Sequence, residues 1–305
     1  MREKRQSALI SSVVRTVKIE GADGLLLAAD EWGDPSRPAV LMCHGAGQNR
    51  YAWKTSAEIL SKRGWFVVTL DARGHGDSDW SSDHKYDAED IGQDLEAVLH
   101  RFTSPPAVVG ASMGGMASLA AQRVCKHQLF AALILVDITP HFDAKGARKV
   151  IGFMSGNPDG FSSLDEAADV ISAYNPHRER PSDPSGLTRV LQQRPDGRWT
   201  WKWDPAYVTS KPGFKAGDEA ALAGHMERVS RTMTEGMLAT TVPILLVRGG
   251  QSDLVTPESV REFQRLVPEA EFVDVAGTGH MVAGDDNDAF TDAVAEFLAR
   301  HHPSS

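Results

Sequence analysis

Three residues of the types used in nucleophilic catalysis each follow an apolar segment of the chain. Ser112 lies in Gly110-Ala-Ser-Met-Gly114, which matches the pattern G-x-S-x-G, and Asp253 and His280 lie in Gly-rich segments further along. A serine hydroxyl is a weak nucleophile at neutral pH, so it needs a base such as imidazole, and the imidazole needs an acid that holds its tautomer. The order Ser, Asp, His therefore predicts acyl transfer through a serine nucleophile.

Each of these residues also has a simpler interpretation. Ser112 could be the N-cap of a Gly-rich helix start, Asp253 a turn or N-cap residue, and His280 a loop histidine. Asp137 is a rival for the acid, because it too ends a predicted strand. We favour Asp253, since Asp137 lies in the segment Val-Asp-Ile-Thr-Pro140, where a carboxylate could order the turn.

Apolar segments that alternate with helical ones must position these residues. Strands are expected at 13–20, 25–32, 38–43, 65–70, 107–111, 131–136, 243–247 and 271–275, and helices at about 51–63, 88–102, 113–127, 257–266 and 288–300. The turn at 21–24 makes the first two strands an antiparallel hairpin, whereas short connections through helices make the later strands parallel. Parallel strands bring their carboxyl ends to one sheet edge, where the three candidates would meet.

The alternation stops between Thr139 and Thr241, where Pro, Gly and Asn interrupt short helical stretches and no strongly apolar strand is found. We therefore expect a core of residues 1–139 and 242–305 and a cap, defined as residues 140–241. The cap holds 13 basic and 13 acidic residues, so the core carries the whole formal net charge of −9. The cap is thus less acidic than the core.

Three tryptophans of the cap, Trp199, Trp201 and Trp203, are spaced by two residues. This spacing is typical of one wall of a substrate pocket or of a small hydrophobic core within the cap, and we favour the core. Trp203 and His141 are nevertheless the candidate substrate contacts of the cap.

In this arrangement the chain resembles the α/β-hydrolase family. The residues that carry the likeness are His44-Gly45 after a strand, the segment Asp71-Ala-Arg-Gly-His-Gly-Asp-Ser78, the elbow at Gly110–Gly114, Asp253 and His280. The likeness covers the chain apart from the variable cap. It implies an α/β-hydrolase fold, with a mostly parallel eight-stranded sheet, helices on both faces and an inserted, mainly helical cap.

The resemblance also implies a role for each site residue. Ser112 would be the nucleophile, His280 the general base and then acid, and Asp253 the carboxylate that orients it. The backbone N–H groups of Ala46 and Met113 would form the oxyanion hole. His44 and the turn around His75 are usually structural in such proteins.

Three branches of the family are excluded, two by the residue at the elbow and one by the oxyanion loop. Haloalkane dehalogenases and epoxide hydrolases carry an aspartate where this chain has Ser112, and the HGGG loop of one esterase branch is absent because residue 46 is alanine. The closer likeness is to small bacterial serine esterases and to cofactor-free haloperoxidase-like proteins. It implies neither a cofactor nor a metal.

The function expected from these features is hydrolysis of small to medium carboxylic esters through an acyl-enzyme. The charge-balanced cap and a weaker likeness to monoalkyl phthalate hydrolases favour a half-ester of a dicarboxylic acid. A carbon–carbon bond hydrolase or a perhydrolase would use the same three residues, and a small-molecule receptor of the same fold would use the same pocket.

Composition sets the remaining expectations. The 305 residues are 41 % hydrophobic and 24 % charged, as in ordinary globular proteins, and the negative net charge argues against nucleic acid or membrane as partner. Cys43 and Cys125 show no metal-binding spacing, and no signal peptide or apolar run of about 20 residues is recognised. We expect a cytoplasmic protein that binds a small-molecule ester, with homodimer formation left open.

Overall fold

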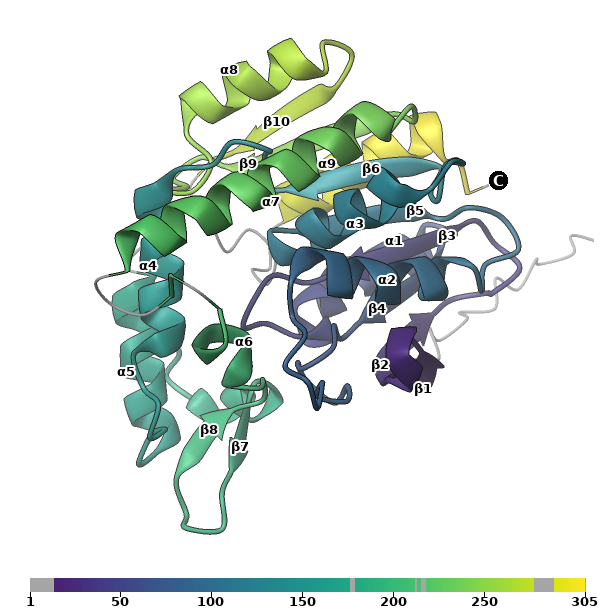
Figure 1. Cartoon of the computed structure of the whole chain (residues 1–305). Helices are drawn as coiled ribbons and strands as arrows, with labels where there is room; N and C mark the ends of the chain where they lie inside the picture. Colours follow the sequence, from purple (N-terminus) through teal and green to yellow (C-terminus); the bar gives the residue numbers. More distant parts are fainter. Residues whose placement is uncertain (1–13, 176–178, 212, 215–217, 277–287, 305) are drawn as a thin grey trace, which may run out of the picture.

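The computed structural model describes residues 14–175, 179–211, 213–214, 218–276 and 288–304. An eight-stranded sheet forms its centre, with the strands in the order β1-β2-β4-β3-β5-β6-β9-β10 (Figure 1). The strands are β1 (Arg15–Glu20), β2 (Leu26–Trp32), β3 (Ala39–Cys43), β4 (Phe66–Leu70), β5 (Ala107–Ala111), β6 (Ala132–Val136), β9 (Ile244–Gly249) and β10 (Glu271–Val275). The β1–β2 and β2–β4 pairs are antiparallel and the other pairs parallel, which confirms the expected hairpin and fold class.

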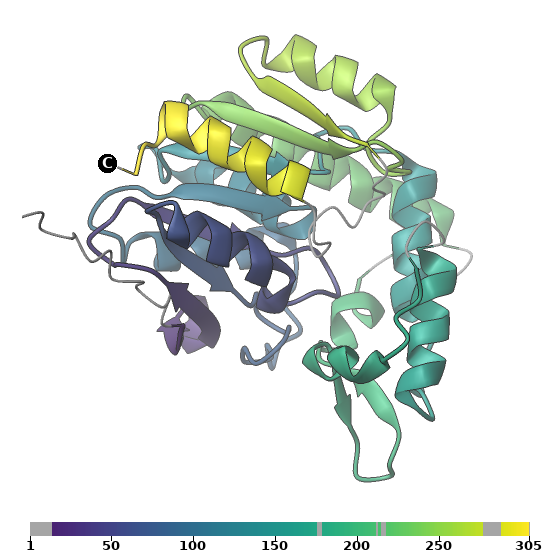
Figure 2. The same ribbon diagram turned by 180° about the vertical axis from the view of Figure 1, so that it is seen from behind.

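Helices cover both faces of this sheet. Helices α2 (Ala88–Leu99), α3 (Met113–Val124) and α7 (Glu219–Ala239) lie on the face towards the viewer in Figure 1. Helices α1 (Lys54–Lys62) and α9 (Asp288–His301) lie on the opposite face, which Figure 2 shows in front. Helix α8 (Pro257–Leu266) lies beside the edge strand β10.

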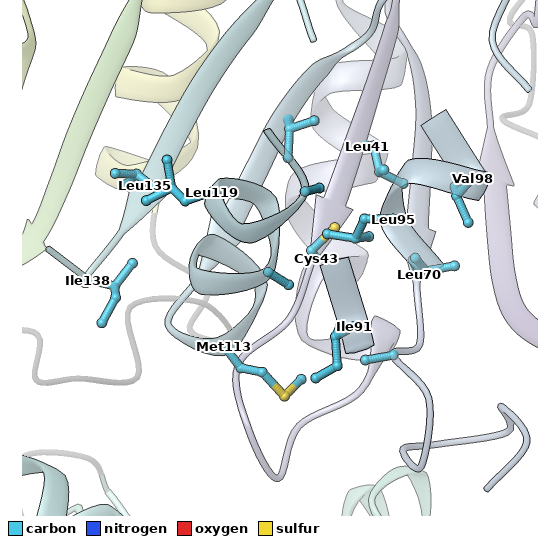
Figure 3. Close-up of a cluster of buried hydrophobic side chains, with 14 of the residues drawn as sticks. Leu41, Cys43, Leu70, Ile91, Leu95, Val98, Met113, Leu119, Leu135 and Ile138 are labelled. Carbon is cyan, nitrogen blue, oxygen red and sulfur yellow. The ribbon is translucent and has the colours of Figure 1, made fainter. Parts of the chain in front are cut away.

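The alternation of side chains along β3 divides the core into two layers. Leu41 and Cys43 point to the layer under α2 and α3, while Val40 and Met42 point to the layer under α1 and α9. Figure 3 shows the first layer, in which Leu41 and Cys43 lie near Leu95. Burial of one such side chain contributes roughly 1.5–3 kcal/mol, so both faces of the strand anchor the loop that follows it.

The chain between β6 and β9 adds no strand to the large sheet in the part that the structure describes. It forms α4 (Ala144–Ser155), α5 (Leu164–Tyr174), α6 (Ala206–Thr209), α7 and a two-stranded hairpin of β7 (Leu191–Gln193) and β8 (Trp199–Trp201). Helices α4 and α5 and the hairpin lie beyond one end of the sheet (Figure 1). Short 3₁₀ helices are found at Ala22–Gly24, Arg50–Trp53 and Pro184–Arg189.

One expectation for this segment was wrong. Helix α7 is 21 residues long, although the sequence predicts only short helical stretches there. The prediction failed because glycines interrupt the pattern, yet one of them allows close packing. A Cβ atom on Gly236 would lie less than 3.0 Å from the carbonyl oxygen of Leu119, so the second half of α7 packs directly on α3.

Candidate active site

Ser112 lies in a strained turn between β5 and α3. Its φ of 43° and ψ of −108° are unfavourable for a residue with a side chain, and its amide donates a hydrogen bond to Val136 O (3.0 Å). The flanking glycines are required by close approach: a Cβ on Gly110 or Gly114 would lie less than 3.0 Å from backbone atoms of Gly115 or Cys43. The G-x-S-x-G pattern thus places a serine at the carboxyl ends of the parallel strands.

The amide of Met113 is one candidate donor for an oxyanion. Met113 is the first residue of α3, where N–H groups have no intrahelical acceptor and the helix dipole favours negative charge.

The amide of Ala46 is the second candidate. The neighbouring amides are both occupied, since Gly45 N donates to Gln48 Oε1 (3.0 Å) and Gly47 N to His75 Nε2 (3.2 Å). Among the residues that the structure describes, no backbone carbonyl accepts a hydrogen bond from Ala46 N. A Cβ on Gly45 would lie 3.6 Å from the Cβ of Ser112, so this loop passes beside the serine.

Two buried histidines hold the loop that carries Ala46. The amide of Ala72 donates to His44 Nε2 (3.0 Å), which leaves the proton on Nδ1, 2.8 Å from Gly45 O. His75 accepts from Gly47 through Nε2, so its Nδ1 donates to Arg73 O (3.1 Å). Burial lowers the pKa of both rings, that of His75 to about 3, so both are neutral. This agrees with the structural role expected for them.

Asp253 follows β9 and lies in a loop that another carboxylate holds. Asp137 is buried with a φ of 51°, and its two oxygens accept from Gly249 N (3.1 Å) and Ser252 Oγ (2.6 Å). Asp253 itself is largely exposed, and its Oδ2 lies 2.5 Å from the ammonium of Lys149 on α4. Asp137 therefore orders the loop from which Asp253 projects.

His280 falls in the segment 277–287, outside the described residues. Strand β10 ends before it at Val275, and β10 pairs in parallel with β9, which precedes Asp253. Strands β5, β9 and β10 run in the same direction, so the segments that follow them leave one edge of the sheet.

Two cavities of about 430 and 390 Å³ both reach Ser112 and Ala46. Val150 and Met154, from helix α4, line both of them. The first cavity extends between α2 and α7, and its apolar lining includes Ile91, Met113, Met116, Ile138, Tyr207 and Val229. The second extends between the loop at 45–52 and α5, and its lining includes Tyr51, Ile171, Tyr174, Leu187, Trp201 and Trp203. A bound molecule could therefore place a group on each side of Ser112.

Comparison with known proteins places this arrangement in a family. Residues 38–286 match the family model described as alpha/beta hydrolase fold. The chain belongs to the α/β-hydrolase family. The expected resemblance is thereby confirmed, and the mostly parallel eight-stranded sheet with helices on both faces is the fold that the resemblance implied.

Several relatives resemble this α/β-hydrolase over most of their length. Esterase Rv0045c of Mycobacterium tuberculosis is 29 % identical over 290 residues, which cover 92 % of this chain and 89 % of the relative. The 3-hydroxybutyrate-oligomer hydrolase of Cupriavidus necator is 31 % identical over 269 residues, covering 83 % and 86 %.

Solved structures show the same fold. A crystal structure of E-2-(acetamidomethylene)succinate hydrolase gives a TM-score of 0.77 at 20 % identity, covering 94 % of this chain and 99 % of that one. A structure of the M. tuberculosis esterase gives 0.68 at 27 % identity, covering 94 % and 92 %.

Two of the three tryptophans line a cavity, and one of them also packs against other aromatic side chains. Trp203 lines the second cavity, as does Trp201, whose ring also packs against Phe161 and Phe153 at centroid distances of 5.4 and 5.7 Å. His141 is exposed, lines neither cavity, and has its Nδ1 2.9 Å from Ser230 Oγ. Contact of His141 with a substrate stays a prediction.

The sequence did not predict that Lys211 lines the first cavity. Lys211 follows α6, and its side chain is only 9 % exposed. Burial lowers its pKa to about 8. Its local sequence, Ser210-Lys-Pro, is typical of an exposed turn and gives no signal of burial. Only the fold reveals that this lysine belongs to the cavity.

The described residues contain no group of three or more His, Cys, Asp or Glu side chains that could hold a metal ion. No helix in the described part of the chain is both long and apolar enough to cross a membrane.

Proposed function

We propose that the protein hydrolyses carboxylic esters through an acyl-enzyme on Ser112. The observation that carries this proposal is the strained serine at the elbow, beside the Ala46 loop and at the junction of two cavities. The names of two relatives support it, since one is an esterase and the other hydrolyses oligomers of a hydroxy acid.

We expect the reaction to proceed in two steps. Ser112 attacks the ester carbonyl while His280 takes its proton, and the amides of Ala46 and Met113 donate to the oxyanion of the tetrahedral intermediate. His280 returns the proton to the leaving alcohol. Water then attacks the acyl-enzyme with His280 as base and releases the acid, while Asp253 holds the imidazole in the required tautomer.

The substrate proposed is a small to medium ester with a group on each side of the carbonyl. Residues 140–241 would act as a cap over the core of residues 1–139 and 242–305, because α4 lines both cavities. Within this class we propose a half-ester of a dicarboxylic acid, such as a monoalkyl phthalate. The charge balance of the cap on an otherwise acidic protein supports an anionic substrate.

The test is steady-state hydrolysis of p-nitrophenyl esters from acetate to long acyl chains, with Ser112→Ala beside the wild type. We expect kcat to fall by roughly 1,000-fold or more in the variant. Ser118→Ala is the matched control on the same helix, because that hydroxyl donates to Gly114 O and lines neither cavity. A fluorophosphonate should form a serine–phosphorus bond in the wild type with loss of fluoride, so that the protein gains the mass of the phosphonyl group, and it should not modify Ser112→Ala.

Any of three results would contradict the proposal. Hydrolysis that persists at the wild-type rate in Ser112→Ala would remove Ser112 as nucleophile. Absence of turnover on every ester would favour the carbon–carbon hydrolase, and tight binding without turnover would favour the receptor.

A further inference from the structure

The first cavity contains a buried cation that the proposed triad does not use. The Lys211 ammonium lies 4.0 Å from the ring centroid of Tyr207 and 5.7 Å from that of Phe214. Its nearest carboxylate oxygen in the described structure is Asp87 Oδ1 at 3.9 Å, which is too long for a hydrogen bond. Two aromatic rings and one carboxylate at the limit of an ion pair are thus the neighbours of this charge that the described residues supply.

A buried ammonium normally needs hydrogen-bonded partners, because its removal from water is costly. Asp87 meets this need only in part. Its side chain is 61 % exposed and accepts the backbone N–H of Asp90 in the capping box that begins α2. The three N–H donors of Lys211 thus have no hydrogen-bond acceptor among the residues that the structure describes.

Two other carboxylates of the cavity are engaged elsewhere. Glu89 accepts from Thr232 Oγ1 at 2.7 Å and lies 3.9 Å from Arg123. Asp90 accepts from Asp87 N at 2.9 Å. Both belong to the first turn of α2, where the helix dipole stabilises negative charge. They do not take the place of a hydrogen-bonded partner for the lysine.

The same cavity extends from Lys211 to Ser112, so one bound molecule can reach both. Tyr207 gives a second measure of this proximity, because its ring contacts the Lys211 ammonium on one side and the ring of His75 on another, at 5.1 Å. His75 in turn accepts from Gly47, next to the proposed oxyanion donor. The ring of Tyr207 therefore contacts both Lys211 and His75, the histidine that holds the loop of Ala46.

We propose that Lys211 binds a free carboxylate of the substrate and thereby selects esters that carry a negative charge on the side of the first cavity. This inference rests on the proposed ester hydrolysis at Ser112. A carboxylate suits the site because it accepts charge-assisted hydrogen bonds from the ammonium while the rest of the molecule packs on apolar side chains. Lys211 is a residue that determines specificity and takes no part in proton transfer.

The experiment compares kcat/KM for two pairs of esters that differ in one charge. Monomethyl adipate and methyl hexanoate place the charge difference on the acyl side, and 4-acetoxybenzoate and 4-acetoxybenzamide place it on the alcohol side. We expect the wild type to prefer the anion in one pair. Lys211→Met should lower kcat/KM for that anion by roughly 10- to 100-fold and change the neutral partner by less than about threefold.

Two further variants separate charge from packing. Lys211→Arg keeps a cation and should retain part of the preference. Lys145→Met removes the same charge from an exposed position on α4 that lines neither cavity, so the preference should be unchanged. If Lys211→Met lowers both members of each pair equally and also lowers Tm, Lys211 is only a link between α6 and Asp87, and the proposal is overturned.

The failure of this proposal is distinguishable from failure of the proposed function. Equal rates on charged and neutral esters in both pairs, with hydrolysis dependent on Ser112, would overturn the role of Lys211 and leave esterase activity standing. Calorimetric titration of adipate into Ser112→Ala tests the site without turnover. We expect binding at least tenfold weaker when Lys211→Met is added, and equal binding would overturn the proposal.

Discussion

The ammonium of Lys149 lies 2.5 Å from Oδ2 of Asp253, so a charged side chain of α4 pairs with the carboxylate proposed to orient His280. Two backbone contacts strengthen this docking. Asp143 N donates to Leu254 O at 2.9 Å, and a Cβ on Gly146 would lie less than 3.0 Å from Asp253 O. Helix α4, which lines both cavities, is thus attached to the loop that carries Asp253. The position of α4 is therefore coupled to that of the Asp253 carboxylate.

Replacement of Lys149 by methionine is expected to change the pH dependence of hydrolysis. Loss of a cation beside Asp253 strengthens the electrostatic stabilisation of the His280 imidazolium, which raises its pKa. The acidic limb of the kcat/KM profile should therefore move to higher pH by a few tenths of a unit, since the pair is exposed and screened. Lys145→Met on the same helix is the control, and a shift of equal size there would contradict the specific effect.

The two aspartates that compete for the role of acid should respond differently to replacement by asparagine. Asp253→Asn should lower kcat by roughly 1,000- to 10,000-fold with little change in Tm, because its side chain is largely exposed. Asp137→Asn should lower Tm, because an amide cannot satisfy the Gly249 amide and the Ser252 hydroxyl as a carboxylate does. Kinetics and thermal unfolding of both variants check this, and the opposite pattern would assign the acid to Asp137.

The sheet and the elbow could be predicted because their signals are local. Apolar segments of five or six residues gave strand ends within one or two residues, as at Ala107–Ala111 and Glu271–Val275. The close contact of Gly110 is with Gly115, within the same strand, turn and helix, whereas that of Gly114 is with Cys43 at the end of the neighbouring strand β3. The spacing of the two glycines around the serine is nevertheless a local pattern that indicates the geometry of Ser112.

The cavity walls could not be predicted, because contacts between distant segments form them. Lys211 is buried by Tyr207 nearby and by Asp87, which is more than a hundred positions away in the chain. Helix α7 was missed for the same reason. Gly236 weakens its local pattern and is favourable only because Leu119 of α3 lies against it.

The charge of Lys211 gives a prediction about pH. Burial lowers its pKa to about 8, although the nearby carboxylates of Asp87, Asp90 and Glu89 oppose this effect. Lys211 is therefore protonated below about pH 8 and loses its charge above it. The ratio of kcat/KM for the anionic ester to that for its neutral partner should be constant below about pH 7 and fall between about pH 7 and 9.

The ratio isolates the lysine from other titrating groups. Ionisation of His280 affects both esters alike and cancels, and burial of His225 lowers its pKa, which keeps that ring neutral in this range. Burial of Tyr207 raises the pKa of its phenol, so it stays protonated. Arg228, which also lines this cavity, is common to all the variants compared. In Lys211→Arg this ratio should not fall with pH. If kcat/KM of the wild type depended on pH in the same way for the anionic and the neutral ester, the prediction would be contradicted.

Two glycines of α7 should respond in opposite directions to alanine. Among the described residues, only the Arg228 side chain lies near the place of a Cβ on Gly224, at 3.8 Å. Gly224→Ala should therefore raise the free energy of unfolding by about 0.5–1 kcal/mol. Gly236→Ala should lower it by about 1–3 kcal/mol, because the new methyl group meets the backbone of Leu119. Urea unfolding of both variants measures the difference. Since helix propensity favours alanine equally at the two positions, a stabilised Gly236→Ala would show that α7 does not pack against α3.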